Sequence, residues 1–267
     1  MRQFARRWSL QAVLSLLALL AGLLASRPGS AQMLEPGAAL EDAGLYFTAP
    51  LRWDQKDWLY FATTMAAVAV THEFDDDIRD HFVDDPEAAI GVENDNGTRD
   101  ALPTVALLAG TWAYAAMIGS QDGYYETGTM LEAGVLTAAS TLLFKYSFGR
   151  ERPYDTLDVD SWFAGGDSFP SGHASLSFAV GTVFAESGSD RYRWLRRILG
   201  YGVAGATSYV RVRDNAHWAS DVVAGAALGF ATAQFTMNRR DLNHRRSTTT
   251  VVPVEGGLML SWSLPLR

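Results

Sequence analysis

Apolar residues gather in six long segments that are separated by turn residues. The segments lie at about 56–72, 101–119, 128–147, 171–187, 192–211 and 217–238. Each is rich in Ala, Leu, Val and aromatic residues, and no alternating strand pattern interrupts them. The pattern therefore predicts an all-α body, a six-helix bundle.

The N-terminal part of the chain has a different pattern. Residues 1–31 begin with arginines, continue with an apolar stretch and end in small residues before Gln32, which is typical of a secretory signal peptide. The apolar run of about 16 residues is short for a membrane span, although an uncleaved anchor is the alternative. Residues 32–55 lack a sustained period and are interpreted as an arm. We therefore expect an exported protein, periplasmic or secreted, whose body is 56–240.

The C-terminal residues, 241–267, change to the pattern of strands. Two runs, Thr248–Val254 and Leu258–Leu264, flank a Glu-Gly-Gly turn, and the second run alternates apolar with polar residues. This predicts a short β-hairpin tail. Because a lone hairpin is marginal in water, we expect it to lie against the bundle or a partner.

The uncharged runs raise the question of a membrane. Only Ala101–Gln121 clearly reaches the length of about 18 residues that a span needs, and it contains a proline and two glycines. Buried helices of a compact bundle explain the other runs. Peripheral or integral membrane association of the body stays open as the alternative, and the pattern does not specify an oligomeric state.

Composition and charge limit the function. The chain has 267 residues, 48% of them hydrophobic, and a mean hydropathy of −0.02, which suits one ordinary domain. Without cysteine, thiolate nucleophiles and cysteine-held zinc are excluded. Residues 1–31 hold four of the 22 basic residues and no acid, so the remainder has 18 basic and 30 acidic residues, a net charge of −12. No binding of nucleic acid is expected from such a charge.

One segment carries much of the acidity. Residues 73–100 hold eleven acidic residues and two arginines, including three consecutive aspartates at 75–77. We expect a solvated acidic connection there. Positive charge for an anion must then be local, and it is found in three motifs.

These motifs combine histidines, cations and a serine. They are Lys145-x6-Arg152-Pro153, Pro170-Ser171-Gly172-His173 and Arg211-x5-His217-x3-Asp221. His217 and Asp221 are four residues apart, so on a helix beginning near 217 they share a face. The carboxylate can then accept one imidazole N–H and leave the other nitrogen bare as a nucleophile. A solvated His–Asp pair on a helix surface is the alternative.

The second motif lies where a helix is expected to begin. Pro170 favours a helix start just after it, and the first N–H groups of that helix point outward with the positive end of its dipole. An anion fits there, with Gly172 allowing close approach and Ser171 offering a hydroxyl. His173 is then placed to protonate a leaving group. A simple N-cap serine beside a surface histidine is the alternative.

The remaining motif residues are cations. Guanidinium forks of Arg152 and Arg211 fit phosphate oxygens, and Lys145 adds a charge at the end of an apolar helix, where it also suits the helix dipole. The other arginines near them are expected to be solvated surface or linker charges. They are Arg150, Arg191, Arg193, Arg196, Arg197 and Arg213. The remaining histidines are too scattered to suggest a metal site.

Three such motifs in this order resemble the type 2 phosphatidic acid phosphatase (PAP2) superfamily, which includes bacterial acid phosphatases and vanadium haloperoxidases. The resemblance covers about 56–238 and departs at Val210, where the family often has serine. It implies a PAP2-like phosphatase domain at 56–240. The implied catalytic residues are His217, His173 and Asp221, and the implied phosphate-binding residues are Lys145, Arg152, Ser171, Gly172 and Arg211.

The implied activity is metal-independent hydrolysis of a phosphate monoester or pyrophosphate through a phosphohistidine. No cofactor is expected, and vanadate should inhibit because it adopts a five-coordinate shape. A vanadium-dependent haloperoxidase, with vanadate as cofactor, and a non-enzymatic scaffold are the alternatives. The substrate stays open between a lipid phosphate and a soluble phosphorylated small molecule. Four aromatic residues are candidates for an apolar entrance: Trp112, Tyr114, Trp162 and Phe163.

Overall fold

The computed structural model describes residues 36–93, 97–187, 192–245, 249–254 and 257–262. The predicted signal peptide lies outside the described residues. In chain order the elements are α2 (Pro36–Phe47), the 3₁₀ helix η2 (Ala49–Arg52), α3 (Gln55–His72), α4 (Asp75–Phe82), α5 (Gly97–Ile118), α6 (Gln121–Phe148), α7 (Gly172–Glu186), α8 (Arg193–Arg213), α9 (Ala219–Arg245), β1 (Thr249–Val254) and β2 (Gly257–Trp262).

The helical body agrees with the predicted class, but the predicted number of helices is wrong. The described part of the chain has eight α-helices, of which α2 and α4 were not expected. α2 falls in the predicted arm, where Tyr46 bonds Thr232 of α9 at 2.7 Å between hydroxyl oxygens. α4 falls in the acidic connection. Its first turn holds the three consecutive aspartates, which favour the positive end of a helix dipole, so the acidic run begins a helix.

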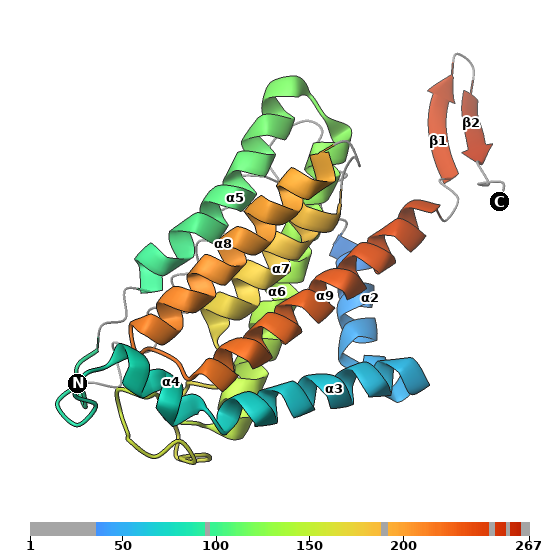
Figure 1. The fold of residues 1–267 in the computed structure, drawn as a ribbon. Helices are drawn as coiled ribbons and strands as arrows, with labels where there is room; N and C mark the ends of the chain where they lie inside the picture. The colour runs from blue at the N-terminus through green and yellow to red at the C-terminus, as the bar shows by residue number, and fades with distance from the viewer. Residues whose placement is uncertain (1–35, 94–96, 188–191, 246–248, 255–256, 263–267) are drawn as a thin grey trace.

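α7 is the central helix of the bundle, with α6, α8 and α9 packed along it (Figure 1). Its inner face joins Leu108 of α5 and Met130 of α6 in the main apolar core. α7 and α8 approach closely at Gly181 and Gly200, where a Cβ on Gly181 would lie 2.5 Å from the carbonyl oxygen of Gly200. Glycine therefore lets the two backbones touch, which holds the helices in register.

The directions of the helices bring four helix ends together. α6 and α8 end, and α7 and α9 begin, at the lower end of the bundle in Figure 1. The loop between α6 and α7, residues 149–171, folds over the same end. All three predicted motifs belong to these helix ends and this loop, although they are far apart in the sequence.

The outer faces of the bundle carry many apolar side chains. Within the described residues, two helical stretches are long and apolar enough to cross a membrane, Thr98–Ile118 and Asp122–Phe148. The first is only 11% buried and the second 67% buried. α3 also exposes large side chains, among them Trp58, Leu59 and Tyr60. Both α3 and α5 therefore expose apolar surface.

The chain continues past α9 as two short strands. β1 and β2 pair antiparallel, with Thr249 opposite Trp262 and Val254 opposite Gly257. Figure 1 shows them beyond the end of α9 and apart from the bundle, rather than against it.

Candidate active site

The start of α7 forms one side of the candidate site. Ser171 is the N-cap residue, and its backbone N–H donates to the carbonyl of Asp221 at 3.0 Å. Its side chain makes no cap hydrogen bond, and its buried Oγ has no hydrogen-bond partner among the described residues. Capping therefore does not explain this serine. A buried hydroxyl beside open helix N–H groups is a suitable donor for an anion.

α9 lies unusually close to this helix start. A Cβ on Gly225 would lie 2.6 Å from the carbonyl oxygen of Ser171, which is far inside van der Waals contact. A Cβ on Gly172, in contrast, would make only ordinary contacts, with Thr141 at 3.7 Å and Lys145 at 4.0 Å. Gly225 thus brings α9, which carries Asp221, against the second motif.

His217 lies in the tight loop between α8 and α9, two residues before α9 begins. Its backbone N–H donates to the carbonyl of Arg211 at 3.2 Å, and Asn215 adopts a positive φ of 56° in the turn, a conformation that asparagine tolerates. The imidazole is buried. The loop thus fixes the third motif's arginine and histidine to each other.

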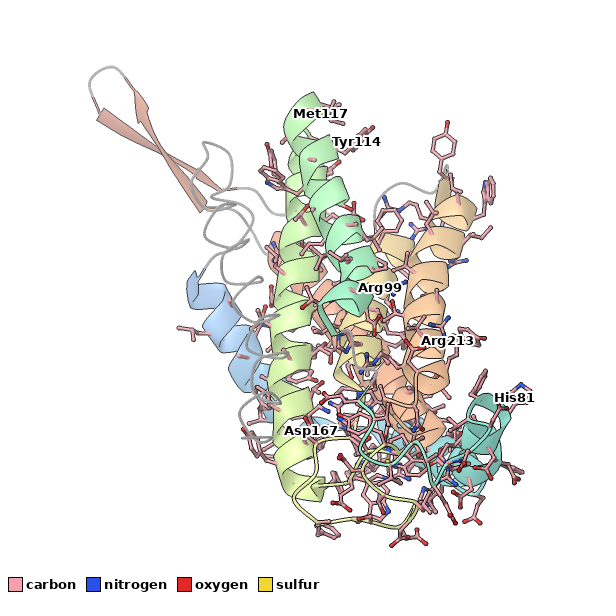
Figure 2. The ribbon with its side chains drawn as sticks, turned by 90° about the vertical axis from the view of Figure 1, so that its left-hand side faces the viewer. His81, Arg99, Tyr114, Met117, Asp167 and Arg213 are labelled. Atoms are coloured by element: carbon pink, nitrogen blue, oxygen red, sulfur yellow. The ribbon has the colours of Figure 1, made fainter. Side chains whose placement is uncertain are left out.

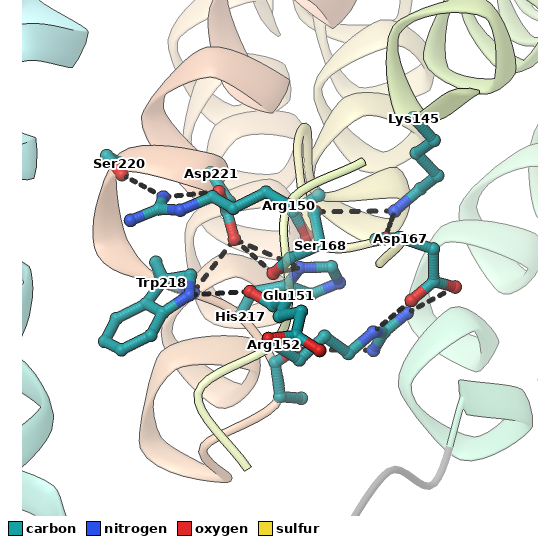
Figure 3. Close-up of polar contacts among 12 residues, drawn as sticks. Lys145, Arg150, Glu151, Arg152, Asp167, Ser168, His217, Trp218, Ser220 and Asp221 are labelled. Carbon is teal, nitrogen blue, oxygen red and sulfur yellow. Dashed lines mark hydrogen bonds and ion pairs between the residues drawn. The ribbon is translucent and has the colours of Figure 1, made fainter. Parts of the chain in front are cut away.

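The partner of the imidazole differs from the expectation. Nδ1 of His217 is 3.7 Å from Oδ2 of Asp221, longer than a hydrogen bond, and 3.4 Å from Oγ of Ser168. The Ser168 hydroxyl donates to the same Asp221 oxygen, as does the backbone N–H of Trp218 (Figure 3). The Ser168 hydroxyl oxygen can therefore accept a hydrogen bond from the Nδ1–H group while its own hydrogen is donated to Asp221. This arrangement protonates Nδ1 and leaves Nε2 bare.

Lys145 and Arg152 meet over Asp167, as Figure 3 shows. The Lys145 ammonium donates to the backbone carbonyls of Asp167 and Ser168. Nε of Arg152 donates to the Asp167 carboxylate at 2.8 Å, and one of its terminal nitrogens donates to the carbonyl of Ala216 at 3.3 Å. The first motif is thereby joined to the loop that carries His217.

Arg211 is fully buried at the end of α8 and donates to the carboxylate of Asp100 at 2.5 Å. Asp100 belongs to the first turn of α5, so a fifth helix contributes to this end of the bundle. Two of the three cations therefore face a carboxylate, Asp100 or Asp167, that lies outside the motifs.

Charge and burial set the protonation of the site. Burial first, and then the charges of Arg152, Lys145, Arg211 and His173, hold the pKa of His217 well below its usual value. The three cations of the motifs and the second imidazole thus all act on the charge of His217. Burial lowers the pKa of Lys145 to about 8. Burial raises the pKa of Asp221, against the opposing effects of Arg150 and Ser168.

The expectation that Arg150 is a solvated charge is wrong, because its side chain is fully buried and bonds Asp221 at 2.8 Å. The acidic connection is not simply solvated either, since Asp75 is buried against Arg150 at 2.9 Å. Neither residue is marked by a motif. Ser168 was also missed, although its position three residues before Ser171 could have drawn attention to it.

The four aromatic candidates for an apolar entrance separate in space. Tyr114 lies at the end of the bundle opposite Asp167 (Figure 2), so it does not line the site. Trp112 packs against the main core. Trp162 lies 4.5 Å from the Arg150 guanidinium, measured to the ring centroid. Only Phe163 is a strongly exposed ring in the loop that covers the site.

A comparison with family models matches residues 127–245 to the PAP2 superfamily. This matched stretch, 119 of the chain's 267 residues, is called the PAP2 segment below. All eight predicted site residues fall within this PAP2 segment. His72, Asp75 and Asp100, which contact it, lie outside.

Among curated proteins, the chain is similar to the lipid A 1-phosphatase of Porphyromonas gingivalis, with 37% identity over 121 residues. The match covers 45% of this chain and 24% of that relative, so the chain spans about a quarter of the relative's length. No solved structure matches the chain. The PAP2 segment and this relative support a phosphatase, a hydrolase of phosphate esters.

Proposed function

We propose that this protein hydrolyses a lipid phosphate through a phosphohistidine intermediate on His217. The observation that carries the proposal is the setting of this imidazole. It is buried, its pKa is held low, its Nδ1 faces Ser168 and Asp221, and the cations of the first and third motifs act on it. A neutral imidazole with Nε2 bare is the form that attacks phosphorus.

In the first step Nε2 of His217 attacks the phosphorus, and the bond from phosphorus to the leaving oxygen breaks as the P–N bond forms. His173, in the first turn of α7, gives its proton to that oxygen. The imidazolium of His217 is stabilised by Asp221 through Ser168. Lys145, Arg152 and Arg211 stabilise the charge on the three equatorial oxygens.

In the second step water replaces the departed alcohol. His173, now neutral, takes a proton from water, and the oxygen of that water attacks phosphorus while the P–N bond breaks. Inorganic phosphate leaves and His217 is neutral again. The open Ser171 hydroxyl and the first N–H groups of α7 support the same oxygens in both steps.

The mechanism is tested by trapping. The protein is mixed with substrate, quenched in alkaline denaturant, in which phosphohistidine survives, and digested for mass spectrometry. We expect the phosphoryl group on His217, and the variant H217A should neither trap phosphate nor turn over while it keeps its helical circular dichroism. The matched control is H81A, because His81 lies on α4 outside the site (Figure 2). A phosphoryl group elsewhere, or turnover by H217A, would rule out the nucleophile.

A lipid phosphate is proposed on two grounds. The curated relative is a lipid A 1-phosphatase, and the exposed apolar surface of α3 and α5 suits contact with lipid. Phosphate release from a lipid phosphate in mixed micelles should exceed release from a soluble monoester by at least about tenfold in kcat/KM, since only the lipid gains remote binding. Equal values for the two substrates would favour a soluble monoester.

Export is the last part of the proposal. It depends on the signal pattern of residues 1–31, and an exported enzyme meets lipid phosphates of the cell envelope. N-terminal sequencing of the purified protein should begin at Gln32. A chain that begins at its first methionine would indicate a retained anchor.

A further inference from the structure

Arg150 has no role in the proposed mechanism, yet it contacts Asp221, which has one. Its guanidinium is fully buried, and so are the two carboxylates that flank it, Asp221 and Asp75. A buried guanidinium is costly unless charges and hydrogen bonds compensate it. The contacts of this one show what it holds in place.

The guanidinium joins α9 to α4. One terminal nitrogen donates to Oδ1 of Asp221 and to the hydroxyl of Ser220, each at 2.8 Å (Figure 3). The other donates to Oδ2 of Asp75 at 2.9 Å and to the carbonyl of Val159 at 2.8 Å. Asp75 in turn accepts from the backbone N–H of Ser220 at 2.9 Å. Both carboxylates are thus tied to one guanidinium.

Further contacts prevent the guanidinium from turning. Nδ1 of His72 lies 3.0 Å from it, and Nε2 of the same ring lies 2.9 Å from Asp160. Nδ1 of the ring also lies 3.1 Å from Oδ2 of Asp75, so the imidazole contacts the guanidinium and both aspartates. The indole rings of Trp162 and Trp218 lie 4.5 and 5.1 Å from the guanidinium carbon.

The two oxygens of Asp221 therefore have different partners. Oδ1 accepts from Arg150, while Oδ2 accepts from Ser168 and Trp218 and faces His217. With Oδ1 fixed, the carboxylate cannot rotate away from the imidazole. We propose that Arg150, held by Asp75 and His72, is the positioning residue that keeps the Asp221 carboxylate ionised and turned toward His217. The inference rests on the proposed function, in which Asp221 stabilises the imidazolium.

The charges around Asp221 set the direction of the expected effect. The charged and titratable groups that act on it are Asp75 of α4, Lys145 of α6, Arg150 of the following loop and His217. His72 of α3 contacts Arg150 and Asp75 rather than Asp221. Arg150 lowers the pKa of Asp221 and Asp75 raises it. Loss of the cation therefore raises the pKa, so Asp221 is protonated at a higher pH. Loss of the Asp75 charge acts in the opposite direction.

The test is the acid limb of the kcat/KM profile against pH. In R150M we expect this limb to move to higher pH by about one to three units, because that is the usual effect of an adjacent arginine on an aspartate. At a pH below the shifted limb, each unit by which the limb has moved lowers kcat/KM tenfold. R150K should recover part of it, since an ammonium lacks the fork that spans both carboxylates. D75N should leave the limb in place or move it to lower pH.

The matched control is R79M. Arg79 is also nearly buried and lies over the Trp218 ring at 5.4 Å, but its carboxylate partners are Asp76 and Asp80 of its own helix. Its acid limb should coincide with that of the wild type. If R150M is folded and its acid limb is unshifted, or if D75N moves the limb to higher pH as R150M does, the inference is wrong. If R150M does not fold, R150K and D75N are compared instead. The acid limb of R150K should move to higher pH, and that of D75N should stay in place or move to lower pH.

The trapping experiment separates this inference from the proposed function. A wild-type protein that traps phosphate on His217, with R150M and R79M alike in their acid limbs, would overturn the positioning role alone. A protein with no phosphoryl group on His217, but with the limb of R150M shifted, would overturn the nucleophile and leave Arg150 as the residue that holds Asp221.

Discussion

The contact between α7 and α9 at Gly225 offers a test of how the site is held together. In the variant G225A the new methyl group would lie 2.6 Å from the carbonyl oxygen of Ser171 and 3.0 Å from Oγ of Ser175. Ordinary contact begins at 3.4 Å, so the two helices must separate by about 0.8 Å at this point. The hydrogen bond from Ser171 to Asp221, at 3.0 Å, crosses the same contact. Separation therefore moves the start of α7 away from His217, the proposed nucleophile.

Stability and activity should respond differently to this change. Overpacking costs about 1–3 kcal/mol, and alanine regains about 1 kcal/mol in helix propensity, so the net loss of unfolding free energy is about 2 kcal/mol or less. A misplacement of about 1 Å in a catalytic arrangement costs about 100-fold in rate. We therefore expect kcat to fall about 10- to 100-fold in a protein that remains folded.

The measurements are the thermal midpoint by circular dichroism and phosphate release from lipid phosphate in micelles. The matched control is G202A, because a Cβ on Gly202 of α8 meets nothing within 4 Å. This variant should gain stability and keep its activity. If G225A keeps the wild-type kcat within about threefold at an unchanged midpoint, close packing at Gly225 does not position the site.

Three further predictions concern the ligands and protons of the site. Orthovanadate at micromolar concentration should inhibit phosphate release, and an unaffected rate would contradict a five-coordinate phosphoryl site at His217. The rate should be highest on the acid side of neutral because His173 must carry a proton, and a rate that still rises well above pH 8 would contradict that role. The pKa of Lys145 is lowered to about 8, so its charge is lost as pH rises through 8 and KM should increase there. In K145R this increase should be absent, because arginine stays charged. A wild-type KM that stays constant up to pH 10 would contradict a role of the Lys145 charge in binding.

Much of the fold follows from local patterns in the sequence. The six long apolar segments correspond to α3 and α5–α9, because turn residues such as Gly149, with a positive φ of 52°, mark their ends. α4 was missed because its eight residues are too short and too acidic for the apolar pattern. α2 was missed for another reason. It is held by contacts to α9, such as Asp42 to Arg239 at 2.7 Å, which local sequence does not reveal.

The candidate site divides in the same way. Motif spacing predicted the eight candidate residues that lie together at this end of the bundle, because they belong to helix ends and adjoining loops whose chemistry is local. Ser168, Arg150 and Asp75 were not predicted as parts of the site. The last two are 75 residues apart, and their contact depends on how α4 packs against α9. Nothing in the sequence distinguishes Arg150 from the solvated arginines, such as Arg213, which pairs with its neighbour Asp214 on the surface.

Charge balance explains why the missed residues had to exist. The chain beyond residue 31 is strongly acidic, yet four cations, Lys145, Arg150, Arg152 and Arg211, are buried at one end of the bundle. Buried charges need buried or adjacent partners, and the motifs supply only Asp221. Three more aspartates therefore complete the set: Asp75, Asp100 and Asp167. Asp75 and Asp221 are fully buried and both pair with Arg150, so we expect these ion pairs to persist when a ligand binds. Asp167 is about one-third exposed and pairs with Arg152, so under the proposed mechanism it is the carboxylate with which an arriving phosphate must compete.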